Sequence, residues 1–150
     1  MTALLLALGW LSISTQGCKR GPESNSGEDG YRHVAVEAQL DSFIYDDFAG
    51  PEGDNTDWRR FELKSPTEVI LTVVVENEKA EVSVGLYDTY GQVLAQDYKR
   101  AADSARITVK GEAPAGTVFV KVAAGKTRYR SNYTMNIKLG ESRFVPLRPF

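Results

Sequence analysis

Residues 69–76 of this 150-residue chain have the sequence VILTVVVE. Successive side chains of a β-strand point to opposite faces, so the odd-numbered residues of this segment would share one apolar face. These residues are Val69, Leu71, Val73 and Val75. Thr72 falls on the other face, and a strand with one apolar and one wet face is typical of antiparallel sheets. The segment therefore predicts an antiparallel strand that buries one face.

The same alternation recurs along the chain between turn signals, and no long window has a helical apolar stripe. Apolar faces are expected for Val82, Val84 and Leu86, for Ile107 and Val109, for Val118, Val120 and Val122, and for Tyr133, Met135, Ile137 and Leu139. Further strands are expected at residues 42–48, 57–63 and 93–97, with turns at 88–91, 113–116 and 124–127. About eight strands at this spacing predict an all-β fold, an antiparallel two-sheet, jelly-roll-like β-sandwich over residues 33–140.

The N-terminal segment has a different composition. Residues 1–17 carry no charged side chain, and residues 3–13 are almost continuously apolar. Such a run is too short for a bilayer core, which takes ~20 residues, but has the length of a secretory signal. Residues 1–17 therefore predict a signal peptide, with an uncleaved hydrophobic helix as the alternative.

The sequence STQGC at residues 14–18 resembles a bacterial lipobox, in which small residues and a glycine precede the cysteine that is lipidated. It departs from that pattern at Thr15, where leucine is usual, and in having no basic residue near Met1, which a start codon farther upstream would explain. The resemblance implies an acyl anchor on Cys18. It places the protein in a bacterial envelope, at the periplasmic face or cell surface of the outer membrane.

Two segments flank the expected sandwich. Residues 18–32 predict a lipidated N-terminus followed by a flexible linker, because residues 21–30 are polar, acidic and rich in Gly, Ser and Pro. Residues 141–150, ESRFVPLRPF, are called here the C-terminal tail. Two interpretations stay open for its apolar side chains, which either pack back on the sandwich or dock on a partner.

Four segments carry motifs in a recognisable order: DWRRFEL at 57–63, VGLYDTYGQVLA at 84–95, AGTVFVKV at 115–122 and NYTMNI at 132–137. They resemble the PPC domain, the bacterial pre-peptidase C-terminal β-sandwich, over about residues 41–139. The resemblance implies a β-sandwich of the kind appended to secreted peptidases. Arg59 stands where the family usually has an inward tyrosine, and we expect it to pair with an acid at a sheet edge. The sequence DNTD at 54–57 is also longer than the family's usual turn.

Composition restricts the function. The net charge is −2, with 42% hydrophobic and 25% charged residues, which is typical of an ordinary globular domain and favours no nucleic-acid partner. A single cysteine allows no intrachain disulfide, and the single histidine, His33, precedes the strong strand patterns, so we expect no catalytic residue. A hydrolase using Asp54 and Asp57 is a less favoured alternative, because a compact sandwich offers little cleft.

Asp54, Asp57 and Asp88 are the candidate metal ligands, and some PPC-like domains bind calcium near such loops. Calcium takes about six to eight oxygen ligands, more than these side chains supply. The simpler expectation is that Asp54 closes a turn and Asp57 caps a strand. We expect no cofactor, with calcium as the one ion that the pattern would admit.

Tyrosines in loops and a set of alternating basic residues form the candidate partner site, because amphipathic rings are common in binding faces. The basic residues would form one stripe if extended, and the alternative is a charged edge strand that blocks edge-to-edge pairing. The candidate residues are Tyr87, Tyr90, Tyr129, Lys126, Arg128 and Arg130. The sequence thus predicts a non-enzymatic envelope lipoprotein that binds an envelope protein or polysaccharide. A structural spacer, or an accessory module of a secreted peptidase or envelope complex, is the alternative.

Overall fold

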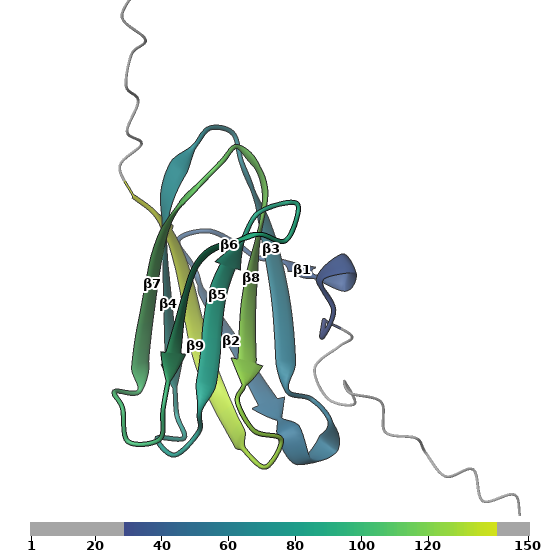
Figure 1. Cartoon of the computed structure of the whole chain (residues 1–150), viewed down its shortest axis with the longest axis vertical. Coiled ribbons are helices and arrows are strands. Elements are labelled where there is room, and N and C mark those ends of the chain that lie inside the picture. Colours follow the sequence, from purple (N-terminus) through teal and green to yellow (C-terminus); the bar gives the residue numbers. More distant parts are fainter. Residues whose placement is uncertain (1–28, 141–150) are drawn as a thin grey trace, which may run out of the picture.

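A computed structural model describes residues 29–140, which fold as a two-sheet β-sandwich (Figure 1). The five-stranded sheet has the order β1-β3-β8-β5-β6 and the four-stranded sheet the order β2-β9-β4-β7. All pairings are antiparallel except β1 with β3, so the predicted fold class is confirmed. The elements are η1 Arg32–Val34, β1 Val36–Glu37, β2 Phe43–Ala49, η2 Gly50–Glu52, β3 Thr56–Leu63, β4 Thr67–Val75, β5 Val82–Tyr87, β6 Val93–Lys99, β7 Arg106–Ala113, β8 Gly116–Ala124 and β9 Arg130–Leu139.

The core lies between the two inner faces, as the alternation predicts. In β4 the odd-numbered residues from Val69 to Val75 are completely buried, while the even-numbered ones face outward and are only half-buried. Fully burying a valine or leucine side chain contributes about 1.5–3 kcal/mol, so such rows hold the sheets together. Leu139 is the exception among the predicted faces, because at the end of β9 it is 39% exposed.

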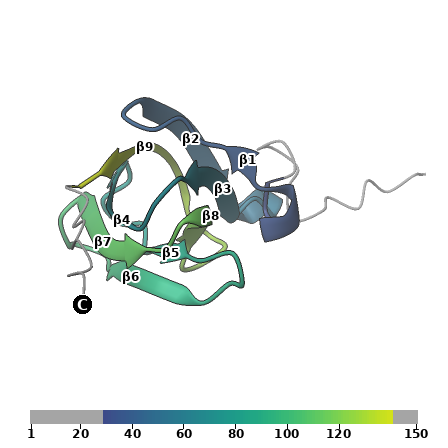
Figure 2. The same cartoon turned by 90° about the horizontal axis from the view of Figure 1, so that it is seen from above.

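The two long sides of the sandwich differ. Seen from above in Figure 2, β6 and β7 lie side by side and close one side, where the two strands contact each other. β1 and β2 mark the other side. There the inward positions include charged residues, with Asp46 on β2 and Arg59 on β3. This side of the core is therefore polar.

Asp29, within the segment predicted as linker, contacts the sandwich. Asp29 is fully buried, its carboxylate pairs with Arg59, and its carbonyl accepts a hydrogen bond from the Trp58 N–H at 2.8 Å. The end of the segment predicted as linker thus supplies a counter-ion to the sandwich. The predicted signal peptide, Cys18 and the C-terminal tail lie outside the described residues. Within residues 29–140, no helix has the length and hydropathy needed to span a membrane.

Candidate functional site

The outer face of the five-stranded sheet carries large rings at the positions that strand alternation turns away from the core. Trp58 on β3, Phe119 on β8 and Tyr87 on β5 all point outward and are half-buried. Phe119 pairs directly with Tyr87 on one side and with Arg60 on the other. Trp58, Tyr87 and Phe119 are called here the aromatic face.

A glycine lets two of these rings meet. The ring centroids of Trp58 and Tyr87 lie 5.1 Å apart, with the planes tilted by 53°. Gly85, which precedes Tyr87 on the same outer face of β5, leaves the space for this contact, because a Cβ there would lie 2.9 Å from Cε2 of Tyr87. Burial raises the pKa of Tyr87, so its hydroxyl stays protonated at neutral pH. The ring pair is therefore a packed, uncharged surface.

Basic side chains lie over the rings. The Lys121 ammonium is 5.4 Å from the Trp58 ring centroid, and the Arg32 guanidinium is 5.4 Å from that of Phe119. The Arg32 side chain also donates a hydrogen bond to the Thr89 carbonyl at 3.4 Å. This bond connects η1 to the turn after β5. Cation–π contacts contribute about 0.5–2 kcal/mol each and hold the cations in place. The face therefore offers apolar rings and positive charge together.

Sequence reasoning identified Tyr87 on this face but missed Trp58 and Phe119. Both stand at outward positions of strands that it did predict, and a large ring at such a position was the available signal. Arg32 could not have been found in this way. Its contact with Thr89 joins residues 57 positions apart in the chain.

The predicted basic stripe does not form, because the connection between β8 and β9 is a turn and not an extended strand. Lys126 pairs with Glu81, with Nζ 2.8 Å from Oε1. This hydrogen bond lowers the pKa of Glu81 and raises the pKa of Lys126. Arg128 lies over the Tyr129 ring at 5.0 Å and donates to its hydroxyl at 3.0 Å. Each basic residue therefore has a local partner.

The remaining predicted partner residues are Tyr129 and Arg130, which are neighbours in the chain, and Tyr90. Arg130 pairs with Glu52 and borders a shallow hollow of ≈ 510 Å³ near the start of β9. Tyr129 packs partly against the core. Tyr90 is 86% exposed at the tip of the β5–β6 turn, close in sequence to Tyr87. Of the predicted set, only Tyr87 belongs to the aromatic face.

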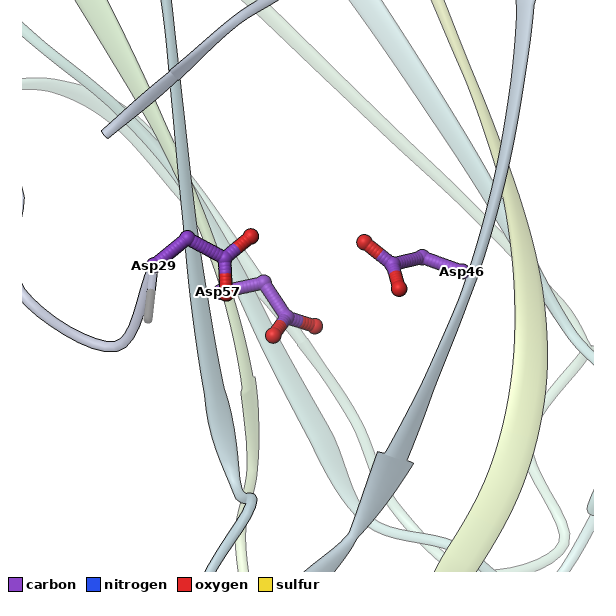
Figure 3. Close-up of side chains that lie close together, drawn as sticks. All are labelled: Asp29, Asp46 and Asp57. Atoms are coloured by element: carbon purple, nitrogen blue, oxygen red, sulfur yellow. The ribbon is translucent and has the colours of Figure 1, made fainter. Parts of the chain in front are cut away.

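A polar cluster lies between the sheets, on the side of the sandwich where β1 and β2 lie. Carboxylate oxygens of Asp29, Asp46 and Asp57 lie within 4.8 Å of one another (Figure 3). Arg59 contacts two of them, with Nη1 3.1 Å from Asp29 Oδ2 and Nη2 bonded to Asp46 Oδ2. The Tyr133 hydroxyl donates to Asp57 Oδ2 at 2.7 Å. The predicted pairing of Arg59 with an acid is confirmed, with two acids in place of one.

This cluster joins the sheets. Arg59 and Asp57 belong to β3 in one sheet, whereas Asp46 on β2 and Tyr133 on β9 belong to the other. Burial, with the charge of Asp57 as the next cause, raises the pKa of Tyr133 well above its usual value. The hydroxyl therefore remains a hydrogen-bond donor at all physiological pH values. We interpret the cluster as an inter-sheet lock.

The three predicted calcium ligands do not come together. Asp88 lies in the β5–β6 turn, where Oδ1 accepts backbone hydrogen bonds from Tyr90 at 2.9 Å and Gln92 at 2.8 Å. Asp57 lies near the start of β3. In the register Asp57 pairs with Val122 of β8 and Tyr87, the residue before Asp88, pairs with Phe119, so Asp57 and Asp88 belong to different strands at different levels of the sheet. Asp54 is buried in the bridge that closes the turn before β3.

Comparisons with known proteins match the fold. No protein-family model and no curated protein matches the chain. The pre-peptidase C-terminal domain of a collagenase from Bacillus anthracis is 20% identical, with a TM-score of 0.59 over 69% of this chain and 94% of that one. This likeness shows that the fold is PPC-like.

Two more distant likenesses have TM-scores below 0.5. PliG from Aeromonas hydrophila, a periplasmic inhibitor of g-type lysozyme, is 12% identical, with a TM-score of 0.49 over 71% of this chain and 96% of that one. The mitogen from Yersinia pseudotuberculosis is 10% identical, with a TM-score of 0.46 over 73% and 95%.

Proposed function

We propose that this chain is a non-enzymatic lipoprotein of the bacterial envelope, anchored through Cys18, whose sandwich binds a protein or polysaccharide of that envelope through the aromatic face. The carrying observation is the contact of Trp58 with Tyr87 on the outside of the sheet. Rings that serve only the core point inward, whereas these rings form an outer surface beside Lys121 and Arg32. Aromatic and arginine side chains are the residue types most often found at the energetic centre of interfaces.

The site chemistry favours binding over catalysis. Two cations at the aromatic face, Lys121 and Arg32, are engaged with its rings, and the carboxylates of the inter-sheet lock are engaged by Arg59 and Tyr133. A general acid or base must be able to reach a substrate proton. Neither set of groups offers that arrangement, and so we assign no catalytic residue.

An accessory role beside a peptidase is the second candidate. The likeness to a domain of a collagenase motivates it. Under this proposal the aromatic face would hold a secreted peptidase or its substrate. Identifying a peptidase as the recovered partner would favour this version over a polysaccharide ligand.

The test is recovery of a partner from detergent-solubilised membranes with the full chain as bait. Replacing both Trp58 and Tyr87 by alanine should weaken recovery about tenfold or more, as expected for central aromatic residues of an interface. Gly85→Ala is a subtler variant, because its methyl group displaces the Tyr87 ring while keeping every aromatic residue. We expect it to weaken binding as well.

Tyr45→Ala is the matched control, because it removes a 77%-exposed ring from the other sheet. It should leave recovery unchanged, and circular dichroism should show all variants folded. Equal losses in Tyr45→Ala and in the aromatic-face variants would place binding elsewhere. Recovery of the wild-type chain alone, with no protein or glycan, would favour the structural spacer.

A further inference from the structure

The outer face of the four-stranded sheet carries a row of side chains that the strand register aligns. Thr72 on β4 pairs with Thr108 of β7 on one side and with Asn136 of β9 on the other. Asn136 in turn pairs with Phe43 of β2. The row therefore runs from an aromatic ring on one edge strand, through an amide, to two hydroxyls. Its central side chains are short, so the surface between the two edge strands is hollowed.

This depression of ≈ 220 Å³ is called here the β2–β7 hollow. Three short polar side chains and three longer ones line it, together with Val74. The short ones are Thr72, Thr134 and Asn136, and the longer ones are Phe43, Arg106 and Lys138. Phe43 and Arg106 come from β2 and β7, the two edge strands of the sheet, so they flank the hollow from opposite sides.

The polar lining is held in place. Asn136 is only 8% exposed, and its Nδ2 donates a hydrogen bond to the Ser42 carbonyl at 2.8 Å. This bond fixes the orientation of the amide and leaves its oxygen as a hydrogen-bond acceptor. The hydroxyls of Thr72 and Thr134 can both donate and accept. The hollow thus offers fixed groups for a ligand that carries hydroxyls.

Two cations add positive charge to the hollow. Within residues 29–140, neither Arg106 nor Lys138 forms an ion pair. Glu68 and Glu112 lie on the same face but pair with each other in the register, beyond the rows that line the hollow. A guanidinium can bind a carboxylate through two parallel hydrogen bonds. The charge of the hollow therefore favours a ligand with an acidic group.

The size of the hollow and its mixture of groups indicate a sugar. Sites that enclose a drug-sized ligand measure about 300–1,000 Å³, so this smaller hollow suits a single small unit. A pyranose ring has C–H groups on its faces and hydroxyls at its edge. The C–H groups can pack on the 68%-exposed ring of Phe43 while the hydroxyls bond to Thr72 and Asn136. An acidic peptide side chain would use the cations but leave these hydroxyl and amide groups without a role.

We propose that the β2–β7 hollow binds one acidic sugar residue, such as a uronate, of an anionic polysaccharide. Arg106 pairs with the carboxylate of the sugar, and Phe43 packs against its C–H face. Thr72, Thr134 and Asn136 bond to its hydroxyls. The hollow and the aromatic face lie on opposite sheets, so this site goes beyond the proposed function and does not depend on it. A single sugar in an open hollow binds weakly, and this site alone does not retain a stable partner.

The test titrates trigalacturonate into the full chain in detergent, followed by calorimetry and by the amide signals in nuclear magnetic resonance spectra. At millimolar concentration the probe should shift the signals of Thr72, Thr134 and Asn136. Arg106→Gln should lower the affinity about tenfold or more, because a charge-assisted hydrogen bond is lost. Phe43→Ala should lower it as well. The neutral trisaccharide galactotriose should bind about tenfold more weakly than trigalacturonate, since it lacks the carboxylates.

Arg100→Gln is the matched control for charge, because it removes an exposed guanidinium in the connection after β6. Tyr90→Ala is the control for an exposed ring, which lies in the β5–β6 turn. Neither should change the affinity, and circular dichroism should show every variant folded. The double alanine variant at Trp58 and Tyr87 should also still bind trigalacturonate, so the two sites are tested separately.

Three results would overturn the proposal. The first is a folded wild-type chain that does not bind trigalacturonate at millimolar concentration. The second is an equal loss of affinity in Arg100→Gln and Arg106→Gln, which would mean that only the overall charge attracts the probe. The third is tighter binding of triglutamate than of trigalacturonate, which would assign the hollow to an acidic peptide.

Discussion

Arg59 shows how one residue that departs from the PPC pattern shapes this interior. The Arg59 side chain is only 11% exposed, and its guanidinium lies between Asp29 and Asp46. A buried ion pair contributes little compared with two apolar side chains, because both charges must leave water. Removing one partner is different, since it leaves the other charges buried without compensation. The position is therefore sensitive to substitution.

Arg59→Met should lower the free energy of unfolding by about 3–5 kcal/mol, because Asp29 and Asp46 lose their shared cation. Arg60→Met, one residue along on the exposed outer face of β3, should cost less than about 1 kcal/mol. Urea denaturation of both variants measures the difference. Similar costs at the two positions would mean that the lock contributes nothing specific.

Calcium should have no effect on the wild-type protein. The three carboxylates that lie within 4.8 Å of one another already contact Arg59 and Tyr133, and the Asp88 carboxylate accepts backbone hydrogen bonds in its turn. We expect Tm in millimolar calcium chloride to stay within about 1 °C of Tm in chelator, because a ligand stabilises a fold only by binding it. A rise of several degrees would restore the calcium hypothesis.

Because of Tyr133, the free energy of unfolding should fall as the pH rises into the alkaline range. Its pKa is raised in the folded state above the value of about 10 for an unfolded tyrosine. Its contribution is thus complete below pH 10 and is lost as pH rises through the folded-state pKa, because only the unfolded chain then ionises freely. Urea unfolding at pH 8 and pH 11 should show a larger loss for the wild type than for Tyr133→Phe. Equal losses would contradict the role of this hydroxyl.

At the scale of the element, β4 shows the alternation most clearly. Leu71 is completely buried, and Thr72 beside it faces outward and is half-buried. Leu71→Ala should cost about 2–5 kcal/mol by leaving a cavity, and Thr72→Ala less than about 1 kcal/mol. Thermal and urea unfolding of both variants test the register. A larger cost at Thr72 would contradict it.

The connection between β8 and β9 could not be predicted from the alternation of side chains. Alternation of Lys126, Arg128 and Arg130 favoured a basic stripe only if the backbone were extended. The chain turns there, and Lys126 instead binds Glu81, which comes from the segment before β5. Long-range partners of this kind leave no local pattern in the sequence.

At the scale of the whole molecule, the sandwich followed from period-two alternation because sheet burial follows the same period. The two-residue strand β1 could not be predicted, since it carries too few residues for a pattern. The candidate binding face was harder to predict than the fold. Tyr87 was predicted as one of several tyrosines that could bind a partner, but its contact with Trp58 depends on pairing both strands with β8.

Anchoring is also a property of the whole molecule. Cys18→Ala should release the protein into the soluble fraction or stall its processing, because the acyl chains would supply the membrane affinity. Membrane fractionation with acyl labelling measures both effects. Ser14→Ala, in the same segment, should leave the labelling intact. Unchanged membrane association, with no acyl label on the wild type, would contradict the lipoprotein assignment.

The burial of Asp29 has a mechanical consequence. Any tension between the sandwich and the chain that precedes it enters the fold at this residue, which is held by the Arg59 ion pair and by the Trp58 N–H. Arg59 passes the load to Asp46 in the opposite sheet, so a pull is shared by both layers. Without that link, force would peel the two-residue β1 from the edge of one sheet. The inter-sheet lock thus connects the first described residue to both sheets.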